Sequence, residues 1–190
     1  FWTSVSLTSP NGGGTEEIIT VAQGESIWFC LVNTGLGTPF VSTLELRPLL
    51  HSMYPLANLS QSLVRQDRWN YGASSQLRYP NDPYDRIWFP VVQGFKTLNS
   101  TREVRTKEGD PFLTPPSVMR TAATTGNLTD HVNMEVAGNP DDRVYVVLHF
   151  AELEQLMSND TRRMDIYYEQ ADQGSPRLLY GNYSPPFLEA

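Results

Sequence analysis

Apolar and polar residues alternate over short stretches of the chain, and turn-forming residues separate these stretches. The apolar positions are rich in β-branched and aromatic side chains, which suit the pleated, half-buried surface of a strand. The pattern predicts strands at residues 18–21, 26–33, 41–47, 132–136, 143–150 and 164–168. Residues 143–150 are almost entirely apolar, which is typical of a central strand that is buried on both faces.

Clusters of glycine, proline and asparagine lie between the predicted strands and mark turns. They occur at residues 11–14, 33–37, 81–83, 138–142 and 173–176. Helical periodicity is weak, and residues 60–69 and 151–157 each predict no more than a turn or two of helix. Many short strands joined by such turns predict an all-β fold, either a β-sandwich or a jelly roll.

A polar stretch at residues 51–62 interrupts the strand pattern. Arginine residues cluster after it, between residues 65 and 105, whereas residues 130–169 are acidic. This shift in composition predicts a boundary between two parts of the chain near residues 51–62.

The composition excludes several classes of partner. The chain has 190 residues and a formal net charge of −7, and its basic residues form no basic run. Neither nucleic acid nor an anionic membrane surface is therefore expected as a partner. No apolar stretch approaches the roughly 18 residues of a transmembrane helix, so no membrane-spanning helix is expected within this chain. The chain begins with Phe1 and shows no leader pattern, and we expect a mature form or a piece of a longer protein.

Five sequons for N-glycosylation predict an extracellular location. Each consists of asparagine, a residue other than proline, and serine or threonine, and each lies in a stretch that we interpret as a turn or loop. The candidate glycosylation sites are Asn58, Asn99, Asn127, Asn159 and Asn182.

Cys30 is the single cysteine, so the chain can form no internal disulfide. It lies within the apolar run 27–32, and we expect a small buried apolar side chain. The alternative is a disulfide to a cysteine outside this chain.

No motif predicts a catalytic residue, a metal site or a cofactor. The three histidines, His51, His131 and His149, are far apart and match no metal-binding spacing. His149 lies in an apolar run and is expected to be structural, bonded to Glu152 or to a backbone carbonyl. Glu152 and Glu154 are a conceivable acid–base pair, but ion pairs or solvation are the expected state of such carboxylates. We therefore expect a non-enzymatic chain.

Residues 69–90 combine aromatic and charged side chains in a pattern that suits sugar binding. An exposed ring covers the apolar face of a pyranose, and neighbouring polar groups bond its hydroxyls. The candidate carbohydrate-binding residues are Trp69, Tyr71, Tyr79, Tyr84 and Asp85. The same composition also suits a packed loop held by hydrogen bonds between arginine and aspartate, and both interpretations remain open. A sugar site would require these rings on one surface.

Several blocks of the sequence resemble the malectin-like region of plant receptor-like kinases, in particular those with leucine-rich repeats. The blocks run almost from end to end of the chain. They are Trp2–Val5 with 27–32, the stretch 33–49, the stretch 78–88, the stretch 115–122, and 145–153 followed by 163–167.

The resemblance implies a malectin-like β-sandwich fold with parts of two tandem lobes in an ectodomain at the outer face of the plasma membrane. Residues 1–50 would be the C-terminal part of the first lobe, 51–64 a linker, and 65–190 the N-terminal and middle part of the second lobe. The implied function is perception of an extracellular ligand, with a cell-wall glycan, an extracellular peptide or a co-receptor kinase as partner. The kinase domain and the segment that attaches the protein to the membrane would both lie outside this chain. Malectin binds glucose disaccharides, but the tyrosine expected in its site near residues 118–121 is absent here. Carbohydrate binding is therefore the alternative function.

Overall fold

A computed structural model describes residues 2–6, 14–92, 94–127, 130–136, 143–169 and 174–190. They form two compact units, Phe1–Arg68 and Trp69–Ala190. The assignment of 1–50 and 65–190 to two lobes, with a linker at 51–64, remains a prediction. The turn predicted at 138–142, and most of the one at 11–14, lie outside the described residues.

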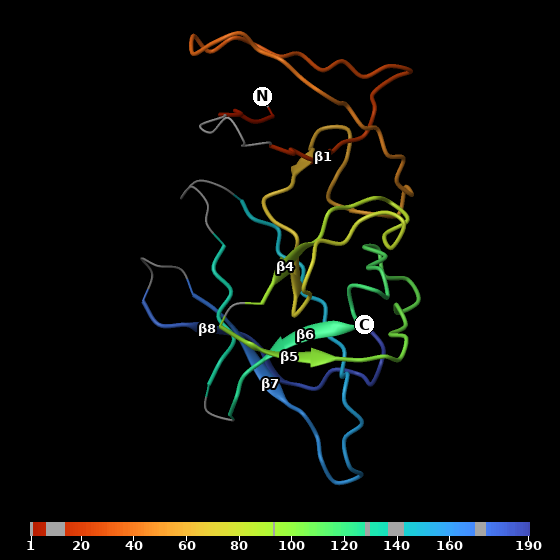
Figure 1. The fold of residues 1–190 in the computed structure, drawn as a ribbon, viewed down its shortest axis with the longest axis vertical. Helices are drawn as coiled ribbons and strands as arrows, with labels where there is room; N and C mark the ends of the chain where they lie inside the picture. Colours follow the sequence, from red (N-terminus) through yellow and green to blue (C-terminus); the bar gives the residue numbers. More distant parts are fainter. Residues whose placement is uncertain (1, 7–13, 93, 128–129, 137–142, 170–173) are drawn as a thin grey trace. The chain divides into compact units, whose positions relative to one another are not determined.

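The described residues form eight short strands and no helix. Figure 1 draws the strands as arrows coloured by their position in the sequence. The all-β class predicted from the sequence is confirmed. Accordingly, none of the residues described belongs to a helix that could span a membrane. The strands are β1 (Ile18–Ile19), β2 (Leu63–Val64), β3 (Trp69–Tyr71), β4 (Phe89–Val91), β5 (Lys96–Asn99), β6 (Thr121–Thr124), β7 (Met164–Tyr168) and β8 (Arg177–Tyr183).

The first unit contains one antiparallel pair, β1 with β2, in which Ile18 lies opposite Val64. Glu17 precedes β1, and its carboxylate forms ion pairs of 2.8 Å with both Arg65 and Arg68, which follow β2. One carboxylate thus anchors two guanidinium groups at the end of this pair of strands.

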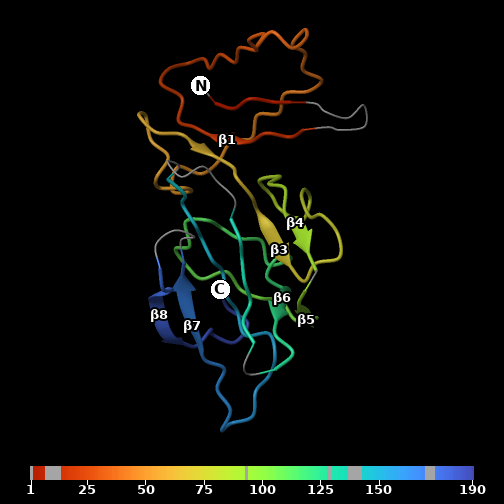
Figure 2. The same ribbon diagram turned by 90° about the vertical axis from the view of Figure 1, so that its left-hand side faces the viewer.

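The described residues of the second unit form three two-stranded sheets, joined by the long loops seen in Figure 2. β3 and β4 are parallel, whereas β5 pairs with β6 and β7 pairs with β8 in antiparallel fashion. The β7–β8 register shifts on either side of Ile166, which indicates bulges in this ribbon. β7 coincides with the strand that the sequence predicts at 164–168.

The core of the second unit is built from four buried side chains: Val104, Met119, Leu153 and Leu188. Residues 186–190 reach this core and form backbone hydrogen bonds to two distant parts of the unit, with Leu188 in a left-handed conformation of φ 50°. On one side the Arg105 amide donates to the Leu188 carbonyl at 2.9 Å. On the other side the Leu188 amide donates to the Glu152 carbonyl at 2.9 Å. The last residues of the chain thus join segments that lie far apart in sequence.

Four of the predicted strands are wrong in this structure. Residues 26–33, 41–47, 132–136 and 143–150 form no strand. The 143–150 segment is also not buried on both faces, because Val144 and Val146 are more than half exposed. Apolar composition alone does not make a strand, which also needs a neighbouring backbone to receive its hydrogen bonds. The helical turns expected at 60–69 and 151–157 are likewise absent; β2 occupies part of the first, and Glu152 bridges to Phe187 in the second.

Cys30 is exposed, so the prediction of a buried side chain is wrong. The apolar run around it is exposed as well: Trp28 is 86% exposed and Val32 is 78% exposed. The run has the composition of a core strand, yet these side chains stay exposed although Trp2 contacts Phe29 of the run, with ring centroids 6.0 Å apart.

Candidate functional site

The candidate site is the loop between β3 and β4, which is organised by Asp85. The Arg78 guanidinium donates two hydrogen bonds to the Asp85 carboxylate, with Nε to Oδ1 at 2.8 Å and Nη2 to Oδ2 at 2.6 Å. The Tyr79 amide also donates to Oδ1 at 3.0 Å. This forked arrangement fixes both ends of the short loop that carries the Tyr79 ring.

Asp82 supplies a second carboxylate in the same loop, and its side chain is completely buried. Its Oδ1 accepts from the Tyr84 amide at 2.9 Å. Its Oδ2 accepts from Arg86 Nε at 2.7 Å and from the Trp88 indole nitrogen at 2.8 Å. Burial of a charge is costly unless it is paired and hydrogen-bonded, and Asp82 meets both conditions.

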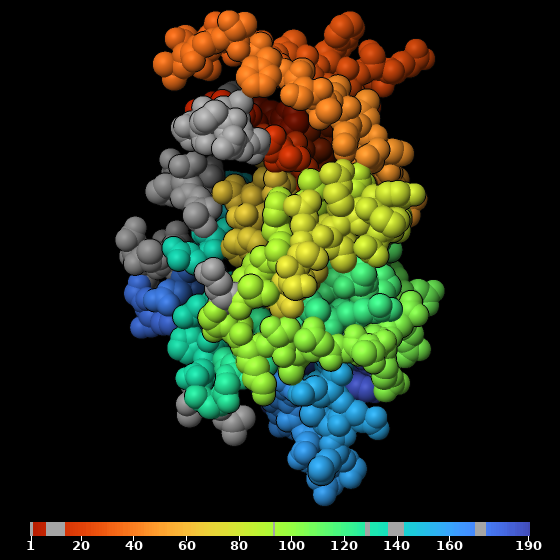
Figure 3. Space-filling view, viewed as in Figure 1, coloured from red at the N-terminus to blue at the C-terminus, as the bar shows by residue number. Residues whose placement is uncertain are grey.

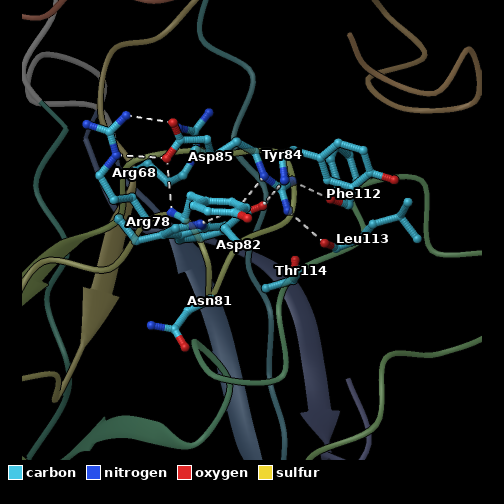
Figure 4. Close-up of polar contacts among 12 residues, drawn as sticks. Arg68, Arg78, Asn81, Asp82, Tyr84, Asp85, Phe112, Leu113 and Thr114 are labelled. Atoms are coloured by element: carbon cyan, nitrogen blue, oxygen red, sulfur yellow. Dashed lines mark hydrogen bonds and ion pairs between the residues drawn. The ribbon is translucent and has the colours of Figure 1, made fainter. Parts of the chain in front are cut away.

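Arg86 connects this loop to residues 110–114. Figure 4 shows Phe112 and Leu113 of that segment close to Tyr84 of the loop. Its Nη1 donates to the Phe112 carbonyl, and its Nη2 donates to the Leu113 carbonyl at 2.7 Å. Asp110 stabilises the turn of residues 110–114 locally. Its carboxylate accepts hydrogen bonds from the backbone amides of Phe112 at 3.0 Å and Thr114 at 3.3 Å. Two loops far apart in sequence are thereby held in one arrangement.

The predicted aromatic residues occupy three different environments. Trp69 and Tyr71 are both half-buried on β3, and their rings contact each other edge to face with centroids 6.2 Å apart. Tyr84 is half-buried and lies 5.5 Å from the Arg86 guanidinium carbon. Tyr79 is the most open of the four, at 67% exposed. The yellow residues around position 80 lie on the visible face in Figure 3.

The sequence does not reveal the burial or the hydrogen-bond partners of the Asp85 carboxylate. It is buried, and its two oxygens already accept three hydrogen bonds from Arg78 and Tyr79. This is the geometry of a packed loop held by arginine and aspartate, which was the alternative interpretation of these residues. A role for Asp85 in bonding a sugar hydroxyl remains a prediction.

All five sequon asparagines are exposed, as a glycan requires. The expectation that all of them lie in turns or loops is wrong for Asn99, the last residue of β5, and for Asn182, which lies in β8. Asn182 adopts a left-handed backbone with φ 57°, and its backbone N–H donates to the Asp165 carboxylate at 2.7 Å. Occupancy of the five sites remains a prediction.

A groove of about 340 Å³ in the second unit was missed by the sequence analysis. Arg162 lies in it between two carboxylates, with Nε 2.7 Å from Glu152 and Nη2 2.6 Å from Glu154. Burial by itself would lower the pKa of Arg162, but the hydrogen bonds and charges of both glutamates outweigh burial and raise the pKa. Both carboxylates are engaged in ion pairs, the state expected for them from the sequence. Their spacing of two residues was the available clue to the groove.

His149 is half-buried, and the partner expected for it is wrong. Its ring contacts the Thr114 hydroxyl, at 3.0 Å from Nε2 and 3.3 Å from Nδ1, rather than Glu152 or a backbone carbonyl. His51 and His131 are exposed. Among the residues that the structure describes, no group of three or more histidine, cysteine, aspartate or glutamate side chains could hold a metal ion.

A comparison with protein families assigns the chain to a class. The model of the malectin-like domain matches residues 1–187, which is nearly the whole chain. The chain therefore belongs to the malectin-like domain family, as the sequence blocks indicated. No solved structure matches it.

Individual relatives come from Arabidopsis thaliana. The chain is 36% identical over 197 residues to "Leucine-rich repeat receptor-like serine/threonine-protein kinase At2g14510", covering 100% of the chain and 21% of that protein. It is 37% identical to "Probable LRR receptor-like serine/threonine-protein kinase MEE39" (87% and 19%) and 37% identical to "Probable LRR receptor-like protein kinase At1g51890" (88% and 19%). The chain thus spans about a fifth of the length of these relatives.

Proposed function

We propose that this chain is part of the extracellular ligand-perception region of a plant receptor-like kinase. The observation that carries the proposal is membership of the malectin-like family, with relatives that are named receptor-like kinases. Five exposed sequon asparagines support an extracellular location at the outer face of the plasma membrane.

The proposed role is non-enzymatic within this chain. The relatives named as kinases are about five times longer than the matched region, so the kinase domain is proposed to lie outside these residues. Ligand binding would shift the association of the receptor with a co-receptor kinase, because a ligand that binds one state more tightly moves the equilibrium toward that state. An extracellular peptide or a cell-wall glycan is the proposed ligand.

Two lobes are proposed for the chain, with residues 1–50 in the first, 51–64 as linker and 65–190 in the second. The division into two compact units after Arg68 supports a two-part organisation.

Carbohydrate binding is the second candidate function, and the exposed ring of Tyr79 is the observation that favours it. The paired Arg78 and Asp85 side chains hold the backbone beneath this ring. Because the backbone is already ordered, only the side chain of Tyr79 has to lose conformational entropy when a sugar stacks on the ring. Trp69, Tyr71 and Tyr84 are less available because each is half-buried.

A binding screen on the complete extracellular region, secreted from a eukaryotic host, tests both functions. Arrays of glycans and cell-wall polysaccharides are compared for the wild type, Tyr79→Ala and Tyr168→Ala, the last being a control at a 51% exposed tyrosine of β7. Carbohydrate binding predicts saturable binding that Tyr79→Ala weakens roughly 5- to 150-fold, by analogy with the stacking of bases on aromatic rings.

The two outcomes separate the candidates. Binding that Tyr79→Ala weakens and Tyr168→Ala preserves makes the chain a lectin-type sensor. A blank array with folded, glycosylated protein rejects carbohydrate binding and leaves the receptor proposal, which is then tested by crosslinking to peptides and co-receptors in plant cells. Retention of the whole protein inside cells would contradict the receptor proposal itself.

A further inference from the structure

Three side chains that carry or can acquire charge hold residues 110–114: Asp110 from within the segment, and Arg86 and His149 from outside it. Asp110 accepts the amides of Phe112 and Thr114, and Arg86 donates to the carbonyls between them. The third contact runs from the Thr114 hydroxyl to the His149 ring. We refer to residues 110–114 together with these three contacts as the latch.

The latch suits the neutral form of His149. Both ring nitrogens contact one and the same oxygen, Thr114 Oγ1, at 3.0 and 3.3 Å. A neutral imidazole has one N–H donor and one acceptor, so a hydroxyl can serve either nitrogen. An imidazolium has two N–H donors, and a single buried hydroxyl beside both nitrogens is a poor acceptor for the pair. The edge-to-face contact with Phe112, at 5.9 Å, keeps that side of the ring apolar.

The charges around the ring add to this preference. Burial lowers the pKa of His149, Asp110 opposes the change, and Arg86 lowers the pKa further. Arg86 cannot easily move away from a positive ring, because its Nε is tied to the buried Asp82 at 2.7 Å. Asp110 is already engaged by two amides of the segment itself.

We propose that protonation of His149 opens the latch, so that mild acid releases residues 110–114 from the second unit. The imidazolium gains full hydration only when the segment opens and admits water to the ring. Acid therefore favours the open form over the closed form. The release also frees two of the Arg86 contacts, which couples the segment to the loop that carries Tyr84 and Trp88. The device is independent of which ligand the module binds.

Hydrogen exchange at residues 110–114 tests the proposal on the complete extracellular region. Amide exchange is measured by mass spectrometry at pH 7.5 and pH 5.0 and corrected for intrinsic exchange rates. The opening equilibrium should rise at least about 3-fold at pH 5.0. The upper limit is about 30-fold, the ratio of protonated to neutral histidine for an ordinary pKa of 6.5.

His149→Gln keeps a neutral polar side chain and should abolish the rise, whereas His131→Gln, a control at an exposed histidine, should preserve it. A titration of the imidazole resonances supplies a second readout that needs no variant of His149 to fold. Both the His149 resonances and the exchange change should titrate below the ordinary histidine pKa of 6.5, because burial lowers the pKa of His149 in the closed form. Unchanged wild-type exchange, an undiminished rise in His149→Gln, or His149 resonances that titrate at or above pH 6.5 would each overturn the proposal.

Discussion

The fully buried carboxylate of Asp82 lies 2.7 Å from Nε of Arg86, four residues later in the same loop. Neither group reaches solvent appreciably, since the Arg86 side chain is 5% exposed. Asp82 bonds to the β3–β4 loop, and Arg86 bonds to residues 110–114. Removal of the pair should therefore loosen both loops.

Arg86→Met should destabilise the second unit by about 3–5 kcal/mol, because it leaves the buried Asp82 carboxylate without its charged partner. Arg105→Met is the matched control, since the Arg105 side chain is 77% exposed and should contribute about 0.5 kcal/mol or less. Chemical denaturation followed by circular dichroism measures both variants. Equal losses for the two arginines would contradict the proposed importance of the buried pair.

Gly72→Ala should destabilise the second unit through a steric clash. A Cβ at this position would lie 2.8 Å from Thr97 Cγ2 and 2.9 Å from the Ala122 carbonyl oxygen, and the backbone has φ +81°. Together these effects should cost about 2–4 kcal/mol. Gly109→Ala separates the two causes, because φ is +83° there and nothing lies within 4 Å. Thermal unfolding should show a clearly smaller loss for Gly109→Ala, and similar losses would exclude the clash.

The two glutamates that bind Arg162 should differ in their contribution to stability. The Glu152 side chain is 6% exposed, and its carboxylate also accepts the Glu154 amide at 2.9 Å. Glu152→Gln should therefore cost about 1.5–3 kcal/mol, as for a buried hydrogen bond to a charged group. The Glu154 side chain is 54% exposed, and Glu154→Gln should cost no more than about 1 kcal/mol. Denaturant titration of the two variants checks the order, and the reverse order would be inconsistent with this structure.

Stability should fall at alkaline pH through Tyr183. Burial raises the pKa of Tyr183 above 10.0, and the charge of Tyr180 acts in the same direction. The unfolded state therefore loses its proton first as pH rises, so the stabilising contribution is complete below pH 10 and is lost above it. Unfolding free energies measured between pH 8 and pH 11 should decrease less in Tyr183→Phe than in the wild type. An identical decrease would assign the effect to other tyrosines.

Removal of the sequon at Asn182 should destabilise the second unit when the replacement residue disfavours the left-handed backbone found there. Asn182 has φ 57°, a conformation that asparagine accepts more readily than glutamine. Asn182→Gln should cost about 1 kcal/mol, whereas Asn182→Gly should preserve stability while also removing the sequon. Thermal unfolding of enzymatically deglycosylated proteins isolates the backbone effect from the loss of sugar. Equal melting temperatures for the two variants would show that backbone strain is not the cause.

The sequence predicted local features well where a residue and its neighbours decide the outcome. β7 formed as expected from the alternation at residues 164–168. The all-β class likewise depends on local composition and turn residues. By contrast, Cys30 and the 143–150 segment have the composition of a core, and only the packing of distant segments decides whether a core forms around them.

The candidate site shows the same limit at the level of single side chains. The sequence identified Asp85 as a group with potential for binding, but it could not show that Arg78 and the Tyr79 amide occupy its oxygens. It also predicted a structural His149, yet the partner, Thr114, lies 35 residues away. Such contacts depend on the path of the loops, which residue type and spacing do not specify.

Residues 186–190 have a consequence for biosynthesis. Leu188 completes the core around Val104 and Met119, but the ribosome adds it 83 residues after Arg105, to whose amide it is bonded. The second unit therefore cannot close its core until this last segment has emerged. In a secreted protein, Asn99 and Asn127 would pass the glycosylation machinery while the unit is still open. Even the strand residue Asn99 would then be presented to that machinery as flexible chain, so sugar attachment would precede the pairing of β5 with β6.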